Sequence, residues 1–126
     1  MILFAALDAR GADAPVRLSI TNDGTEPFRC IVLFGHWVTV DVGTLAPGEV
    51  QLISMKRGAP KGALYVPRFD GRQMMIENVL CGTLAAWSDS LDQIPLMPIR
   101  VGAASAYTVV CRANSRITCS DPGVAE

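Results

Sequence analysis

Four cysteines are the residues of this chain whose types and spacing could do chemistry: Cys30, Cys81, Cys111 and Cys119. Structural zinc sites usually contain a closely spaced Cys-x₂₋₄-Cys pair, and this sequence has none. The Cys-x-x-Cys pair of redox enzymes is missing as well. An even number of widely spaced cysteines therefore predicts two disulfides, with four buried free thiols in a cytosolic protein as the alternative.

One disulfide follows from the local pattern. The stretches Ala106–Arg112 and Arg116–Ser120 flank small and polar residues at 113–115, a pattern that is typical of a β-hairpin. Folding this hairpin about its centre places Cys111 opposite Cys119, at a separation that a disulfide spans. Cys30 and Cys81 are then the second pair, and its loop of about fifty residues would stabilise the fold by about 4 kcal/mol. The other two connectivities stay open at this stage.

His36 is the only histidine, so a Ser-His-Asp or Cys-His mechanism would have to use it. It stands next to Trp37 in the middle of a predicted strand, where a histidine is usually a hydrogen-bonded core or interface residue. No nucleophile motif such as Gly-x-Ser-x-Gly occurs in the sequence. We therefore predict that the protein is not an enzyme and needs no cofactor.

Copper is the alternative chemistry. Thioether and imidazole groups suit Cu(I), and the chain offers His36, Met55, Met74, Met75 and Met97. These residues are dispersed along the sequence, and methionine is also a common gap-filler in cores that contain few aromatic residues. The main prediction is accordingly no metal site, and a copper-binding protein is kept as a second alternative.

Composition limits the class of partner. The chain has 126 residues, half of them hydrophobic, and a net charge of −1. Nucleic-acid binders need a dense positive surface, and basic residues here do not cluster beyond Lys56-Arg57. No stretch reaches the roughly 20 apolar residues of a membrane-spanning helix. We therefore expect neither nucleic-acid binding nor a membrane span.

The N-terminal residues 1–14 support two interpretations. Met1–Leu7 is apolar and Ala12-Asp13-Ala14 resembles a signal-peptidase site, although no positive residue precedes the apolar run. The segment is either the remnant of a secretory signal or the first strand. Together with the predicted disulfides it favours a periplasmic or secreted protein, with one domain over 15–120 and a flexible tail at 121–126.

The first half of the chain is predicted to be strands. Val16–Ile20 alternates apolar and polar residues, as a half-buried strand does. Phe28–Val42 is predicted to be a long strand with a bulge or bend at Gly35. Pro47-Gly48 favours a type II turn before the strand Val50–Met55.

The second half contains a hairpin and a helix. Residues 63–69 and 72–80 flank Asp70-Gly71, a two-residue hairpin signal. Thr83–Gln93 has apolar residues at helical spacing, which predicts a short helix near 83–93. Residues 94–99 contain two prolines and are predicted to be an extended, non-helical edge segment.

Seven or eight short strands separated by frequent turns predict an all-β fold, mainly antiparallel. The stretch Leu18–Val50, with its Asn-Asp-Gly and Leu-Ala-Pro-Gly-Glu turns, resembles bacterial immunoglobulin-like β-sandwiches. The resemblance covers about a quarter of the chain and implies a fold class without a function.

Aromatic, methionine and arginine side chains suggest a binding surface, because these types are enriched at the centre of protein interfaces. The predicted surface combines the hairpin 65–75 with the segment 87–97 and contains Tyr65, Arg68, Phe69, Arg72, Met74, Trp87 and Met97. The function expected from the sequence is an exported, non-enzymatic binding or accessory module that contacts another protein or a second copy of itself. A structural subunit of a larger extracellular or virion assembly is the first alternative.

Overall fold

The structure is a computed structural model that describes residues 14–58, 62–68, 70–102 and 104–121. These residues form nine β-strands, two short α-helices and one 3₁₀ turn. In chain order the elements are β1 (Ala14–Asn22), β2 (Phe28–Phe34), η1 (Gly35–Trp37), β3 (Val38–Leu45), β4 (Val50–Gly58), β5 (Ala63–Pro67), β6 (Gln73–Thr83), α2 (Trp87–Ser90), β7 (Asp92–Gln93), α3 (Met97–Val101), β8 (Ala106–Ala113) and β9 (Ile117–Ser120).

All nine strands belong to one mixed sheet with the order β3-β2-β6-β5-β4-β1-β8-β9, and β7 pairs with β6. The pair β1–β8 is parallel and the other described pairs are antiparallel. The order ends at β3 and β9, so the described sheet does not close. The predicted mainly-β fold is confirmed, with nine strands in place of seven or eight. The immunoglobulin-like sandwich stays a prediction.

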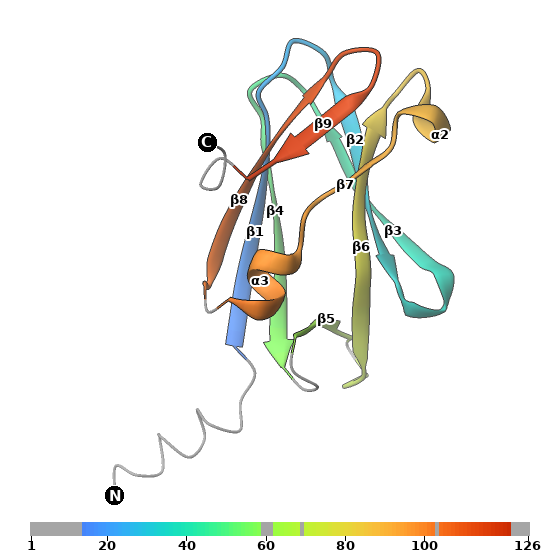
Figure 1. The fold of residues 1–126 in the computed structure, drawn as a ribbon. Coiled ribbons are helices and arrows are strands. Elements are labelled where there is room, and N and C mark those ends of the chain that lie inside the picture. Colours follow the sequence, from blue (N-terminus) through green and yellow to red (C-terminus); the bar gives the residue numbers. More distant parts are fainter. Residues whose placement is uncertain (1–13, 59–61, 69, 103, 122–126) are drawn as a thin grey trace, which may run out of the picture.

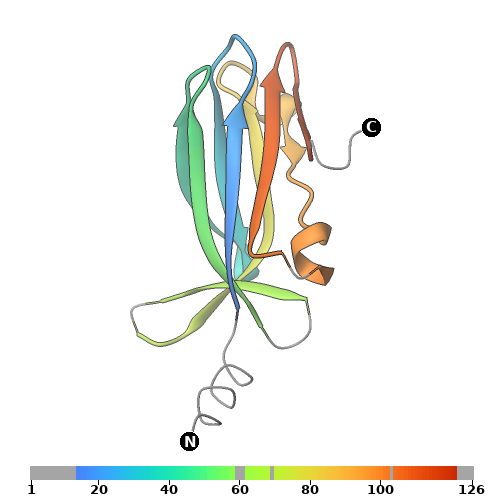
Figure 2. The ribbon, with the colours of Figure 1, turned by 90° about the vertical axis from the view of Figure 1, so that its left-hand side faces the viewer.

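The sheet bends so that its two halves face each other. Figures 1 and 2 show β1, β4 and β8 on one side and β2 and β6 on the other, with β5 passing between them at the lower end. The buried side chains of both halves form a single apolar cluster. The alternation of apolar and polar residues along the strands directs the apolar side chains into this cluster. In β1, for example, Val16, Leu18 and Ile20 are buried while Arg17 is exposed.

Both predicted disulfides are confirmed: Cys30–Cys81 and Cys111–Cys119. Each joins residues that are directly opposite each other in neighbouring antiparallel strands, β2–β6 and β8–β9. Cys111 lies opposite Cys119 as predicted, but the turn of this hairpin is at 114–116, one residue later than the predicted 113–115, and Ala113 is still in β8. Because disulfides persist in oxidising compartments, the two bonds indicate an extracytoplasmic environment.

The helix predicted near 83–93 is shorter than expected, since α2 covers only Trp87–Ser90. Thr83 remains in β6, and its hydroxyl accepts a hydrogen bond from the Ala86 amide at 3.2 Å. The Thr83 amide in turn donates to the Ser90 hydroxyl at 2.8 Å. These local bonds hold the segment as a tight loop around one helical turn.

The prediction that residues 94–99 are not helical is wrong at its end, because α3 begins at Met97. Pro98 lies in the first turn of this helix. Backbone amides in the first turn make no hydrogen bond within the helix, so the missing amide hydrogen of proline costs nothing there. The Arg100 guanidinium donates to the carbonyls of Gly62 and Ile76 at 3.1 and 2.9 Å, which ties α3 to β6 and to the residue before β5.

The predicted N-terminal segment 1–14 and the predicted tail 121–126 fall almost entirely outside the described residues, which begin at Ala14 in β1 and end at Asp121. No helix in the described part of the chain is long and apolar enough to cross a membrane.

Candidate functional site

The chain reverses direction at Gly35–Trp37, so the bend predicted at Gly35 is in the right place but is a full turn, and residues 28–42 form two paired strands instead of one long strand. Phe34 in β2 pairs with Val38 in β3, and the residues between them form the turn η1. His36 and Trp37 both have φ of 65°, in the left-handed region that hairpin turns usually fill with Asn or Gly. Within residues 28–42 Gly35 is the residue that indicates a turn. The apolar and aromatic residues on both sides of it favour a continuous strand.

The side chains of this turn lie at the surface. Trp37 is 86% exposed, the largest exposed fraction among the large apolar residues described. His36 is exposed too, so it is not a core residue. A bulky residue in the left-handed region costs about 1–2 kcal/mol. Strain of this kind on an exposed aromatic is typical of sites that serve a function rather than stability.

The β5–β6 hairpin lies next to this turn. Pro67 pairs with Gln73, and the Arg68 amide donates to the Arg72 carbonyl at 2.7 Å. Gly71 has φ of 86°, but Asp70 is not among the described non-glycine residues with positive φ, and the Gly71 amide donates to the Arg68 carbonyl at 3.0 Å. The predicted β5–β6 hairpin is confirmed, but its turn is longer than the predicted two-residue Asp-Gly turn. The Arg68 guanidinium lies 3.2 Å from the Asp70 carboxylate. The turn therefore holds Arg68 and Arg72 at the same end of the hairpin.

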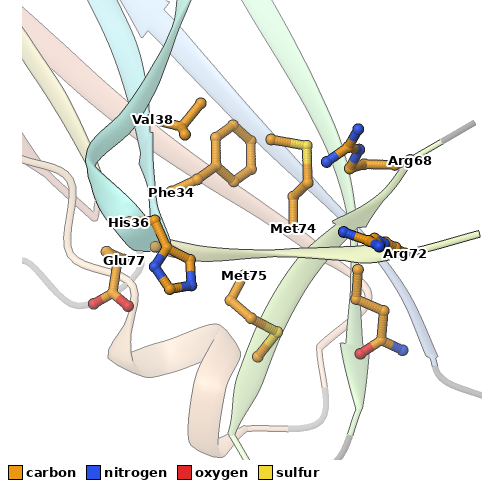
Figure 3. A pocket seen from close by; sticks show the side chains of 10 residues that line it. Phe34, His36, Val38, Arg68, Arg72, Met74, Met75 and Glu77 are labelled. Carbon is orange, nitrogen blue, oxygen red and sulfur yellow. The ribbon is translucent and has the colours of Figure 1, made fainter. Parts of the chain in front are cut away.

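A pocket of about 510 Å³ lies between the turn and the hairpin. Its lining consists of Phe34, Gly35, His36, Val38, Arg68, Arg72, Gln73, Met74, Met75 and Glu77. Figure 3 shows Met74 beside Phe34 and Val38 on one face of β6, and Met75, Glu77 and His36 on the other. Arg68 and Arg72 lie at the far end from His36 and Glu77.

A second hollow of about 430 Å³ adjoins the pocket and shares Phe34, His36 and Glu77 with it. Trp37 lines this second hollow, which links the exposed indole to the same region. We name the region the tip surface and define it by six residues. They are His36, Trp37, Val38, Arg68, Arg72 and Met74.

The structure brings together only some of the residues predicted to bind a protein. Arg68, Arg72 and Met74 line the pocket. Tyr65 is buried in β5, and Phe69 lies outside the described residues. Trp37, which the prediction omitted, is the aromatic residue that this surface exposes.

The segment 87–97 does not extend the tip surface. Trp87 belongs to α2, which Figure 1 shows at the opposite end of β6 from the β5–β6 hairpin. Its ring packs against Gly82 and lies 4.6 Å from the Arg29 guanidinium carbon. Met97 is 61% exposed on α3. The predicted continuous surface is thus divided between separate parts of the molecule.

The copper candidates are also divided. His36, Met74 and Met75 line one pocket, but Met74 and Met75 point to opposite faces of β6 (Figure 3). Met55 is buried in β4, and Met97 lies on α3. The described residues therefore do not direct a set of thioether and imidazole ligands toward one point.

The chemistry available in the tip pocket is polar and cationic rather than nucleophilic. Glu77 is the one carboxylate of its described lining, which contains no serine, threonine or cysteine. His36 therefore has no hydroxyl or thiol beside it in this pocket to activate. The arrangement is suited to contacts with a partner's surface, through two guanidinium groups, an imidazole and apolar side chains.

The strand that follows the tip is a sheet edge. Among the described strands β3 pairs only with β2, and Val38 and Val40 remain 44% and 46% exposed. An edge strand with apolar side chains is able to accept a further strand from another chain.

The chain matches no protein-family model and no curated protein sequence.

Proposed function

We propose that the protein is an exported, non-enzymatic binding module that contacts another protein through the tip surface. The observation that carries the proposal is the 86% exposure of Trp37 on a left-handed turn. Tryptophan and arginine are the residues that most often dominate binding energy at interfaces. Here an exposed tryptophan lies beside a pocket that two arginines line.

The chemistry of the tip surface defines the partner. Trp37 needs an apolar recess that covers the indole, because burying its ring is the largest energetic gain that this surface offers. Arg72 favours an acidic group on the partner, whereas Arg68 is already paired with Asp70 at 3.2 Å, and methionine at position 74 adapts to uneven apolar contacts. The partner is therefore a protein with an apolar recess and a carboxylate placed to meet Arg72.

The proposal includes a periplasmic or secreted location and an immunoglobulin-like sandwich fold. A periplasmic or secreted location is supported by the two disulfides, since such bonds persist in oxidising compartments. An immunoglobulin-like sandwich is supported by the resemblance of Leu18–Val50 and by the two facing halves of the sheet. Such a scaffold would present the turn η1 and the β5–β6 hairpin rigidly.

Site-specific photo-crosslinking tests the proposal in cells that produce the protein. A photoreactive phenylalanine analogue replaces Trp37 in one variant and Leu52 in the control. Leu52 is 54% exposed on β4, outside the tip surface. We expect a discrete protein adduct from position 37 and none from position 52.

A second substitution tests the charges. Adding Arg72→Glu to the position-37 variant should remove the adduct, because the acidic partner is then repelled. Equal adducts from positions 37 and 52, or an adduct that is insensitive to Arg72→Glu, would contradict the proposal.

A second candidate function is a structural subunit of a larger assembly, favoured by the exposed apolar edge of β3. We propose that, in this case, copies associate edge to edge along Val38–Val42. Light scattering over a concentration series should then show oligomers that Val40→Lys abolishes, since a charged residue at a sheet edge blocks such pairing. A monomer at all concentrations would exclude this function.

A further inference from the structure

Three of the four cysteine sulfurs meet at one place in the core. The Sγ atoms of Cys81, Cys111 and Cys119 all lie within 4.8 Å of one another, although they belong to two different disulfides. Cys81 comes from one half of the sheet and the other two come from the opposite half. The two disulfides are therefore neighbours in space.

Strand β7 keeps them adjacent. Asp92 of β7 pairs with Cys81 of β6, and its carboxylate accepts a hydrogen bond of 3.0 Å from the Cys119 amide. The backbone of β9 is thus tied to that of β6 at the level of the sulfurs. This contact between the two half-sheets holds one disulfide within reach of the other.

The two disulfides differ in access to solution. Cys30, Cys81 and Cys111 have no exposed surface, whereas Cys119 is partly exposed. Among the four cysteines only Cys119 has exposed surface, so a thiol in solution approaches the Cys111–Cys119 bond from the side of Cys119. It has no direct path to the Cys30–Cys81 bond in the folded protein.

We propose that the two disulfides form an internal thiol–disulfide exchange centre. When the accessible Cys111–Cys119 bond is reduced, the Cys111 thiolate that is released reduces the buried Cys30–Cys81 bond. A thiolate from a small thiol such as glutathione attacks Sγ of Cys119. A mixed disulfide forms at Cys119 and the Cys111 thiolate leaves.

In the second step the Cys111 thiolate attacks Sγ of Cys81. The Cys81–Cys111 bond forms, the Cys30–Cys81 bond breaks, and Cys30 leaves as a thiolate that takes a proton. A second molecule of the small thiol then releases Cys119 as a thiol. Two small thiols are oxidised to one disulfide, and the protein gains two electrons and two protons.

The geometry makes the exchange selective. Cys81, and not Cys30, belongs to the group of three sulfurs that lie close together. Native exchange therefore gives a Cys81–Cys111 bond and frees Cys30. Scrambling in an unfolded chain would give Cys30–Cys111 as well.

A Cys119→Ser variant tests the second step without any reductant, because it leaves Cys111 as the single thiol. The folded variant is incubated at neutral pH, quenched with acid, unfolded and alkylated at low pH, and then mapped by peptide mass spectrometry. We expect the label to divide between Cys111 and Cys30 in comparable amounts, together with a Cys81–Cys111 crosslinked peptide. Label on Cys111 alone would overturn the proposal.

Two further samples complete the test. A Cys30→Ser/Cys81→Ser variant keeps the accessible disulfide, contains no free thiol and should stay unlabelled. If Cys119→Ser does not fold, the wild-type protein is treated with limiting glutathione and mapped in the same way. A Cys81–Cys111 peptide then supports the exchange, and Cys30–Cys111 as the main new bond contradicts it.

Discussion

The turn at the tip provides a direct test of the structure, because a change there should make the protein more stable and not less. We consider the double substitution His36→Asn and Trp37→Gly. Both positions have φ of 65°, and the new residues are those that tolerate this backbone best. Glycine at position 37 removes a cost of about 1–2 kcal/mol and asparagine at position 36 removes part of a similar cost, so the gain is roughly 2–3 kcal/mol in total.

Two losses offset this gain. Trp37 is 86% exposed, so about a seventh of its surface is buried, roughly 30 Å², and its removal costs about 0.8 kcal/mol. Glycine also gains freedom in the unfolded chain, which costs about 0.5–1 kcal/mol. The net result is a stabilisation of about 1 kcal/mol.

Urea unfolding measures the effect as a rise in the midpoint of roughly 0.5 M at an unchanged slope. The matched control is Trp87→Ala, which removes a ring packed against Gly82 and Arg29 and should cost about 2–3 kcal/mol. Destabilisation of the tip variant by about 1 kcal/mol would refute the reasoning, since it would mean that Trp37 is packed or that the turn is not strained.

Three further predictions concern the scaffold. Asn22→Ala should lower the free energy of unfolding by about 3 kcal/mol, because the buried amide makes three hydrogen bonds to backbone groups, and thermal unfolding measures this loss. Burial and the neighbouring Asp121 raise the pKa of Tyr107 to about 12, which favours the neutral phenol in the folded state. The stability that Tyr107 contributes is therefore complete below pH 10 and is lost between pH 10 and 12, and absorbance at 295 nm should show a late ionisation step that Tyr107→Phe removes. Arg100→Met should cost about 2 kcal/mol and speed hydrogen exchange in α3, because three backbone carbonyls lose their donor; unchanged exchange there would contradict this role.

The sequence was sufficient for most of the strands and for the Cys111–Cys119 disulfide because their signals are local. Alternation in Val16–Ile20 specifies an extended conformation over a few residues, and Gly71 marks the turn between β5 and β6. The Cys111–Cys119 bond followed from the register of one hairpin. Alternation does not specify which strands become neighbours at long range, so the mixed order and the parallel β1–β8 pair were not predicted.

The tip surface was only partly predictable for a related reason. Arg68, Arg72 and Met74 were identified by their residue types, which interfaces favour. Trp37 was not, because the turn at His36 and Trp37 uses residues that normally continue a strand. Tyr65 shows the opposite error, since an aromatic residue predicted for the surface is buried in the core.

The parallel pairing of β1 with β8 has a consequence for how the chain reaches its native state. Arg17 is matched with Ala106 and Asn22 with Cys111, so the first described strand is completed by one that is synthesised some ninety residues later. Contacts between such distant parts of a chain form late and slow the folding reaction. The described sheet is therefore completed only after β8 has been synthesised, although local pairs such as β2–β3 can form earlier.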